Sequence, residues 1–362
     1  MNTKQELSAL TTLRVGGRAE RFERTETPGA MCDAIRQADW EGTPLLLLGG
    51  GSNVVVSDDP FQGLVLQDGR SEILEVGDAE GDVVLDVAAG TPWDHLVAAT
   101  VDHGWSGLEA LSGIPGSVGA APVQNIGAYG REVAENLVSV DAFDRLSAKR
   151  VTLSRQDLEL GYRDSLLKRS LGQEDSRRTA NATPRWIVLS VRLRLPRSPW
   201  SAPIRYRELA LRLGVQIGEA AGAAAVREAV LDLRRSKGMV LDPADHDTWS
   251  AGSFFTNPIL SSEHAQSLPD TAPRFPSGEP GKNQKIKTSA AWLIEHSGFS
   301  RGWSLYPGAQ ASLSTKHVLA VTNRGHATTS DVVALAQAVR AGVEEEFGIR
   351  LVPEPVFVGT EL

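Results

Sequence analysis

The chain has 362 residues, of which 41% are hydrophobic and 23% charged, and its formal net charge is −8 at neutral pH. This length exceeds one ordinary hydrophobic core and predicts two or three domains. The negative charge argues against a nucleic-acid-binding protein but leaves room for a local basic pocket that takes a small anion. The single cysteine, Cys32, excludes an internal disulfide and a cysteine-based metal cluster.

The first ten residues, MNTKQELSAL, lack the apolar stretch of a signal peptide, and no run approaches the ~20 apolar residues of a membrane span. The seven histidines show no metal-ligand spacing. We therefore expect a cytoplasmic protein with no membrane association, no metal and no obligatory protein partner.

Residues 11–70 alternate short strands and turns, with a helix at about 27–39. Within this region, LLLLGGGSNVVVSDD (45–59) predicts a buried strand, a glycine turn and a second, β-branched strand. Consecutive glycines present successive backbone N–H groups in a concave nest that suits a phosphate or diphosphate. A Rossmann fingerprint would need glycine where Val54 stands, and a helix after the turn. The segment indicates a strand–nest–strand phosphate cradle, with a plain hairpin as the alternative.

A strand is expected within 80–90, followed by a helix. Thr91 is a natural N-cap for this helix, Pro92 suits the first helical position, and Gly104 is expected to end it. The block SGIPGSVGAAPVQNIGAYG (112–130) then packs five glycines and two prolines into nineteen residues, a composition that helices and strands resist. It predicts backbone that passes very close to a flat or anionic ligand. The alternative, a flexible linker, fits poorly because the block is rich in apolar residues.

The remaining elements give a mixed α+β order instead of regular βαβ alternation. Strands are expected at about 138–144 and 186–195, a short helix at 151–160, and long helices at about 219–236 and 330–347. A capped helix is expected at 287–298, a strand at 317–323 and an extended C-terminal segment. Residues 172–185 are polar and predict an exposed loop or insertion.

Four short segments carry residues with chemical potential. GYRDS (161–165) places a phenol beside Arg163, whose planar guanidinium suits a carboxylate; the alternative is an ordinary surface ion pair. Ser253, next to two phenylalanines, is either a turn residue or a protected proton donor. Glu354, between two prolines, is either a carboxylate held in a buried setting or an exposed edge residue. A basic helix end with Lys237 either complements the helix dipole or grips phosphates.

Taken in order, these segments closely resemble the UDP-N-acetylenolpyruvoylglucosamine reductase family, flavoenzymes that make UDP-N-acetylmuramate for bacterial peptidoglycan. The resemblance covers 11–359 and is carried by TTLRVGG, LLLLGGGSNVVVSD, GLEALSGIPGSVGAAPVQNIGAYG, LELGYRDSLLK, SKGMVLDP, AGSFFTNP, KTSAAWLIEHSGF and LVPEPVFVG. It implies an α+β fold of the vanillyl-alcohol-oxidase-like type. Residues 1–70 with 351–362 and residues 71–237 would form two FAD-binding subdomains, and residues 238–350 a substrate-binding domain.

The resemblance also implies noncovalent FAD and NADPH as the hydride donor. The residues that would hold FAD are Gly49, Gly50, Gly51, Ser52, Asn53, Ser112, Gly113, Ile114, Pro115, Gly116, Gly119, Ala120, Ile126 and Gly127. Those that would contact the UDP-sugar are Tyr162, Tyr206, Lys237 and Asn257. Small molecules are thus the expected partners.

The implied reaction has two halves: NADPH reduces the flavin and leaves, and the hydride then passes to the vinyl carbon of an enolpyruvyl ether. Hydride addition next to a carboxylate builds negative charge, so a preorganised cation should face it. By resemblance Arg163 takes that role, Glu354 shares in stabilising or protonating the enediolate, and Ser253 donates the proton.

Two other functions remain open. A flavin-dependent oxidase would use oxygen instead of NADPH and often tethers its flavin through histidine or cysteine, neither of which occurs in the two glycine-rich segments. A non-catalytic nucleotide-sugar-binding protein would not need Arg163, Ser253 and Glu354 together.

Overall fold

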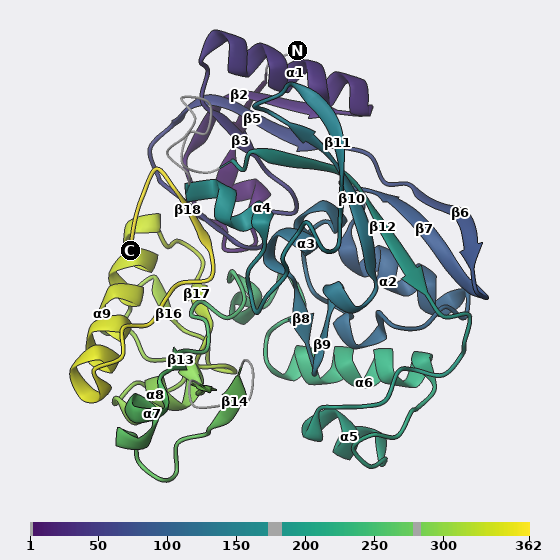
Figure 1. Cartoon of the computed structure of the whole chain (residues 1–362). Coiled ribbons are helices and arrows are strands. Elements are labelled where there is room, and N and C mark those ends of the chain that lie inside the picture. Colours follow the sequence, from purple (N-terminus) through teal and green to yellow (C-terminus); the bar gives the residue numbers. More distant parts are fainter. Residues whose placement is uncertain (1–2, 173–182, 278–283) are drawn as a thin grey trace. The chain divides into compact units, whose positions relative to one another are not determined.

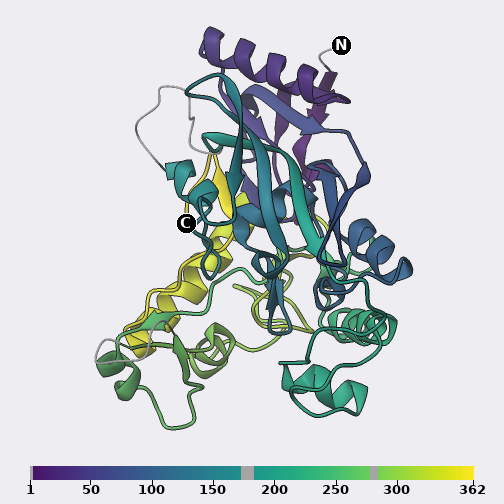
Figure 2. The same cartoon turned by 45° about the vertical axis from the view of Figure 1, so that its right-hand side comes forward.

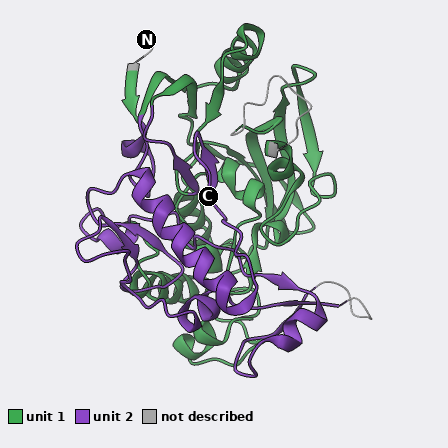
Figure 3. Cartoon of the chain, turned by 90° about the vertical axis from the view of Figure 1, so that its left-hand side faces the viewer, with its two compact units in different colours: residues 1–6, 18–52, 60–241 green, residues 7–17, 53–59, 242–362 purple. Residues whose placement is uncertain are grey.

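The computed structural model describes residues 3–172, 183–277 and 284–362. The chain folds into two compact units (Figure 3): unit 1 comprises residues 1–6, 18–52 and 60–241, and unit 2 comprises residues 7–17, 53–59 and 242–362. Both units therefore contain short pieces of the N-terminal sequence. The further division of the FAD-binding part into two subdomains stays a prediction.

One sheet of unit 1 has the strand order β1-β2-β5-β3, formed by Thr3–Glu6, Arg18–Thr25, Phe61–Asp68 and Leu45–Leu47. Helix α1 (Pro28–Glu41) packs on one face of this sheet and begins after Thr27, whose side chain accepts a hydrogen bond from the Ala30 N–H (Figure 1). Since β3 pairs with β5 and β4 (Val54–Val56) pairs with β18 (Val356–Val358), the two strands around the glycine turn are not a hairpin.

The second sheet of unit 1 is antiparallel, with the order β11-β10-β12-β7-β6 (Figure 2). Its strands are Lys149–Ser154, Leu137–Asp144, Trp186–Leu195, Asp82–Ala88 and Ile73–Ala79. Strand β12 alternates buried and half-buried residues along its second half, as the sequence predicts for a sheet with one core face. The short helix expected at 151–160 is wrong, because residues up to Ser154 belong to β11, which pairs with β10, and residues 155–159 form turns.

Helix α2 (Trp93–Asp102) begins one residue later than expected. Thr91 was the wrong choice of N-cap, because its hydroxyl donates instead to the Glu72 carbonyl, and Pro92 occupies the cap position without a side-chain hydrogen bond. Gly104 follows the helix with φ +71°, a backbone angle that glycine adopts without strain.

Short elements connect these sheets to helices α5 (Arg207–Leu213) and α6 (Ala223–Ser236), which lie side by side (Figures 1 and 2). The connecting elements are η2 (Glu109–Leu111), η3 (Val118–Ala120), α3 (Ala121–Gln124), β8 (Gly127–Ala128), β9 (Arg131–Glu132), η4 (Val133–Glu135), α4 (Leu166–Arg169) and η5 (Ser170–Gly172). Of the polar segment expected as an exposed loop, residues 173–182 lie outside the described residues.

Unit 2 is built around helix α9 (Thr329–Phe347), which begins in a capping box formed by Thr328 and Asp331. Its core joins α9 to Phe254, Phe255 and residues of the helix α8. The other elements are η1 (Leu7–Leu10), η6 (His246–Thr248), β13 (Ile259–Leu260), α7 (Ser262–Ser267), β14 (Phe275–Ser277), β15 (Lys285–Lys287), α8 (Ala290–His296), β16 (Ala311–Leu313), β17 (Val321–Asn323) and β18 (Val356–Val358).

The described residues contain neither a membrane-spanning helix nor a cluster of metal ligands. No helix there combines the length and apolarity that crossing a membrane requires. No group of three or more histidine, cysteine, aspartate or glutamate side chains is arranged there to hold a metal ion.

Candidate active site

The two glycine-rich segments of unit 1 lie against each other. A Cβ atom on Gly50 would stand 2.7 Å from the Gly116 Cα and 3.0 Å from the Gly116 carbonyl carbon. The Ser52 hydroxyl donates to the Pro115 carbonyl at 3.0 Å, which joins the two segments. Glycine is therefore needed at position 50 because the two backbones approach so closely. At position 51 it is favoured for another reason, because the backbone there is left-handed, with φ +62°.

The joined segments offer backbone donors that fit a phosphate group. Within the described residues, the N–H groups of Gly49, Gly50, Gly51 and Ser52 donate no hydrogen bond, and those of Ile114, Gly116 and Ser117 donate none either. Consecutive free N–H groups at a tight turn form the anion-binding nest that the sequence predicts. The residues present therefore fit a bound FAD diphosphate.

The second glycine-rich segment is held by ordinary backbone hydrogen bonds and is not a flexible linker. The N–H groups of Val118 and Gly119 donate to the carbonyls of Thr91 and Ala89, both at 2.8 Å. A Cβ on Gly119 would stand 2.5 Å from that of Ala89, so this glycine also serves close packing. The remaining residues predicted for FAD occupy the same ordered stretch: Ser112, Gly113, Ala120, Ile126 and Gly127.

Arg163 lies against the end of the same glycine-rich block. Its guanidinium donates to the carbonyls of Gly127 at 2.8 Å and Asn125 at 3.3 Å, and lies 5.6 Å from the centre of the Tyr162 ring. The backbone of Arg163 has φ +54°, an uncommon angle for a residue other than glycine and often a mark of a constrained functional turn. The fold thus orients this cation through backbone carbonyls.

Asn125 is a positioning residue that the sequence reasoning missed. Its side-chain amide donates to Glu132 at 2.9 Å and to the Gly161 carbonyl at 2.8 Å. It therefore ties the turn that carries Arg163 to the glycine-rich block. Its φ of +42° is tolerated best by asparagine and glycine, and that preference is the signal that an asparagine inside a glycine-rich block offers.

Two of the predicted substrate contacts lie near the same block in unit 1. The ring of Tyr206, which is 44% exposed, packs edge-on against Tyr129 with the ring centres 5.4 Å apart. Burial raises the pKa of Tyr129 to about 12, so this phenol keeps its proton at neutral pH. Lys237, just after α6, forms an ion pair with Glu208 of α5 at 2.5 Å.

In unit 2 the backbone brings Ser253 close to Glu354. The Glu354 N–H donates to the Phe254 carbonyl at 2.9 Å, and Phe255 bridges to Pro353. Both Ser253 and Glu354 are half-buried. The Ser253 hydroxyl forms no hydrogen bond within the described residues, and the turn before it uses the Ser250 hydroxyl, which accepts from the Gly252 N–H.

Glu354 is held just before β18 by Asn53. The Asn53 side chain donates to the Glu354 carbonyl at 3.3 Å, and its own carbonyl accepts from the Val356 N–H at 3.0 Å. Asn257 has a structural contact as well, because its side-chain oxygen accepts from the Ala290 N–H at the start of α8. Ser253 and Glu354 thus lie together in unit 2, and Arg163 belongs to unit 1.

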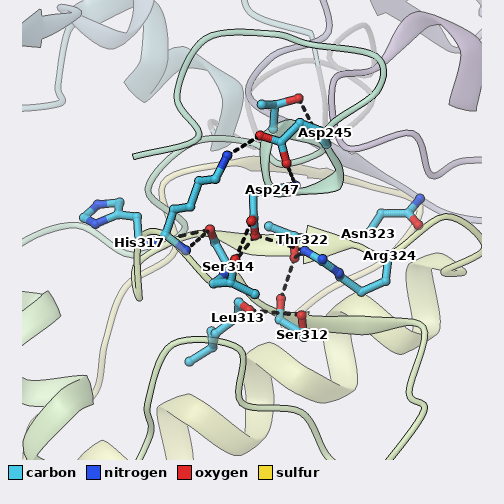
Figure 4. Close-up of polar contacts among 12 residues, drawn as sticks. Asp245, Asp247, Ser312, Leu313, Ser314, His317, Thr322, Asn323 and Arg324 are labelled. Carbon is cyan, nitrogen blue, oxygen red and sulfur yellow. Dashed lines mark hydrogen bonds and ion pairs between the residues drawn. The ribbon is translucent and has the colours of Figure 1, made fainter. Parts of the chain in front are cut away.

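A buried polar network supports the backbone that leads to Ser253 (Figure 4). Asp247 accepts from Arg324 at 3.0 Å and from the Thr315 N–H at 2.8 Å. Burial would raise the pKa of this carboxyl, but Thr315 and Arg324 outweigh that effect and lower the pKa. Asp247 therefore stays ionised and joins η6 to the turn after β16, a role that the sequence did not reveal.

Two protein-family models match the chain. Residues 20–153 match the FAD binding domain, and residues 242–358 match the C-terminal domain of UDP-N-acetylenolpyruvoylglucosamine reductase. The first match covers both glycine-rich segments, whose free N–H groups fit an FAD diphosphate. The chain is a flavoprotein oxidoreductase.

The full-length relatives narrow this class to one family. The UDP-N-acetylenolpyruvoylglucosamine reductases of Nocardia farcinica and Saccharopolyspora erythraea are 51% and 48% identical, each covering 98% of this chain and 89% and 95% of the relative. The crystal structure of the Thermus caldophilus enzyme is 26% identical, with a TM-score of 0.64 over 99% of both chains. The chain belongs to the UDP-N-acetylenolpyruvoylglucosamine reductase family, which confirms the predicted family, fold class and FAD cofactor.

Proposed function

We propose that the chain reduces the enolpyruvyl group of UDP-N-acetylglucosamine enolpyruvate to UDP-N-acetylmuramate in peptidoglycan synthesis, with NADPH as the hydride donor. The observation that carries the residue assignment is the half-buried Ser253 hydroxyl, which has no hydrogen bond within the described residues. The hydrogen bond from the Glu354 N–H to the Phe254 carbonyl brings Glu354 next to it. The FAD that the two glycine-rich segments would hold would supply the hydride chemistry that links NADPH to the vinyl carbon of the substrate.

The proposed role of Arg163 is to stabilise negative charge on the substrate carboxylate. Hydride arrival at the neighbouring vinyl group turns that carboxylate into an enediolate, so charge grows where a guanidinium can contact it in a planar, two-pronged way. Two backbone carbonyls already orient the guanidinium, so little reorganisation is needed when the charge develops.

The proposed roles of Ser253 and Glu354 concern the proton that completes the reaction. A hydroxyl is a weak acid, but the enediolate carbon is strongly basic, and a fixed geometry makes the transfer feasible. Ser253 fits this role because no hydrogen bond within the described residues occupies its hydroxyl. Glu354 would share in stabilising or protonating the same intermediate.

The small-molecule partners follow from this assignment. We propose that Gly49 to Asn53 and the 112–127 segment hold FAD, and that Tyr162, Tyr206, Lys237 and Asn257 contact the UDP-sugar. Lys237 would exchange its Glu208 ion pair for a phosphate contact. Because UDP-sugars and NADPH are cytoplasmic metabolites, we expect the reaction to take place in the cytoplasm, without nucleic acid or a membrane.

Purified protein should be yellow, and anaerobic NADPH should bleach it in the absence of any sugar substrate. Acid precipitation should release all flavin into the supernatant, because the glycine-rich segments hold no cysteine or histidine that could tether it. Absorbance of supernatant and pellet measures this directly. Flavin in the pellet would contradict noncovalent binding. Anaerobic bleaching by an oxidisable sugar but not by NADPH, with the colour restored by air, would favour the oxidase alternative.

Replacing Tyr206 with phenylalanine tests the proposed phosphate contact. Losing a hydrogen bond to a charged group should weaken UDP-sugar binding by ~1.5–3 kcal/mol, seen as a higher KM for the sugar, with NADPH oxidation almost unchanged. Tyr306→Phe removes another exposed phenol, in unit 2, and serves as the matched control. An unaltered sugar KM in Tyr206→Phe would leave Tyr206 with only its packing against Tyr129.

A further inference from the structure

Asp94, in the first turn of α2, binds the loop 112–116 at the start of the second glycine-rich segment of unit 1. Its Oδ1 accepts from the Gly113 N–H at 2.6 Å. The same carboxylate forms a two-pronged pair with Arg227 of α6, with Nη1 at 2.7 Å from Oδ1 and Nη2 at 2.9 Å from Oδ2. Charge-assisted contacts of this kind are strong and directional. One carboxylate thus links the loop to two helices.

The space around Gly113 shows how tightly α6 constrains this loop. Gly113 has φ +70°, and a Cβ on it would stand 2.9 Å from Leu231 and 3.2 Å from Val240. Arg227 and Leu231 are four residues apart, so they lie on one face of α6. That face presents both the ion pair and the Leu231 side chain to the Gly113 peptide, which restricts where this peptide can lie.

Asp94 faces two guanidinium groups at this point: Arg227, which pairs with it directly, and Arg234, whose Nε would stand 3.4 Å from a Cβ on Gly113. Burial would raise the pKa of Asp94, but Arg227 and the Gly113 N–H outweigh it and lower the pKa, so the carboxylate is ionised at neutral pH. The side chain of Arg227 is 15% exposed and that of Asp94 is 39% exposed. An uncompensated carboxylate here would repel a diphosphate at the neighbouring N–H groups; Arg227 compensates that charge by direct contact, and Arg234 adds to the compensation.

We propose that Asp94 and Arg227 are positioning residues for FAD: Asp94 fixes the Gly113 peptide so that the following N–H groups of the loop face the cofactor, and Arg227 neutralises the carboxylate that does so. This inference rests on the proposed assignment of the 112–116 loop to FAD. Neither residue contacts the reacting atoms, and neither belongs to the motifs from which the sequence predicted the site.

The test is FAD binding to apoprotein, measured by flavin fluorescence, together with the thermal midpoint of each apoprotein. Asp94→Ala should weaken FAD binding by about tenfold or more, the scale for a lost charged hydrogen bond. Asp94→Asn keeps an acceptor for the Gly113 N–H and should restore most of the affinity. Arg227→Met should weaken FAD binding, because it removes the guanidinium that pairs with the Asp94 carboxylate. Adding Asp94→Asn to this variant should restore binding, because it removes the carboxylate charge as well.

Asp232→Ala is the matched control, since Asp232 lies on the same helix α6 as Arg227 and forms an exposed ion pair with Arg212 of α5. It should leave FAD affinity unchanged. Asp94→Asn losing as much affinity as Asp94→Ala, or no rescue in the double variant, would overturn the positioning role. A further variant, Gly116→Ala, tests the assignment of the 112–116 loop to FAD separately from the role of Asp94 and Arg227. Its Cβ would stand 2.8 Å from the Ser52 Oγ.

If Gly116→Ala loses FAD and Asp94→Ala keeps it, the loop assignment stands and the inference about Asp94 is wrong. If both variants bind FAD normally, the loop assignment fails and the inference fails with it. If FAD affinity falls only together with the thermal midpoint of the apoprotein, and falls to the same extent in each Asp94 and Arg227 variant, Asp94→Asn included, the pair is merely structural. That result would overturn the proposal.

Discussion

Replacing Ser253 with alanine should slow reoxidation of the enzyme-bound flavin by the enolpyruvyl substrate by ~10²–10⁴-fold, the range for loss of a general acid. Reduction of that flavin by NADPH should stay near the wild-type rate, because the proposed proton transfer comes only after the hydride has left the flavin. Anaerobic stopped-flow absorbance separates these two half-reactions. Bulk structure should survive, since the hydroxyl makes no hydrogen bond within the described residues.

Ser297→Ala provides the matched control for this experiment. It removes a half-buried hydroxyl of unit 2 that donates to the Leu293 carbonyl, and both half-reactions should stay normal. Equal slowing of both halves in Ser253→Ala would instead assign Ser253 to shaping the site or positioning the flavin. Wild-type rates in both halves would leave Ser253 as a turn residue.

Replacing Gly50 with valine should give colourless protein. The valine Cβ would stand 2.7 Å from the Gly116 Cα, a contact with backbone that no side-chain rotation relieves. The two glycine-rich segments must then separate, which disperses the N–H groups proposed to hold the diphosphate. The flavin-to-protein absorbance ratio of the purified variant, before and after incubation with FAD, measures the loss.

Gly77→Val is the control for a glycine that the fold does not need. Gly77 lies in strand β6, and a Cβ there would meet nothing within 4 Å. This variant should retain its full flavin content. Full FAD occupancy in Gly50→Val, with the control equally occupied, would mean that the diphosphate binds elsewhere in the chain.

The glycine-rich segments show which features local sequence predicts and which it does not. Three consecutive glycines before Val54 correctly predicted a turn between two strands with free N–H groups, because this follows from backbone geometry alone. The physical need for Gly50 could not be predicted, because it arises from Gly116, 66 positions away in the chain. The left-handed backbone falls on Gly51, whereas Gly50 is required for close approach.

The start of α2 shows the limit of local rules in another way. Thr91 has the right chemistry for an N-cap, yet its hydroxyl donates to the Glu72 carbonyl and the helix begins at Trp93, one residue later than expected. A competing acceptor brought by the fold outweighed a preference worth about 1 kcal/mol. Local propensity decides a cap only when no tertiary partner is available.

By itself, the sequence determined the family, the α+β class and the FAD cofactor, because ordered motifs over most of the chain constrain these jointly. It also indicated Arg163, Ser253 and Glu354 as residue types suited to a hydride and proton addition. Only the tertiary structure decided which backbone and side-chain groups contact these residues and orient them. Asn125, Asp94 and Asp247 act through partners distant in the chain, and no local spacing encodes such partners. Long-range contacts form only when the chain folds, so their residues carry no pattern in the sequence beforehand.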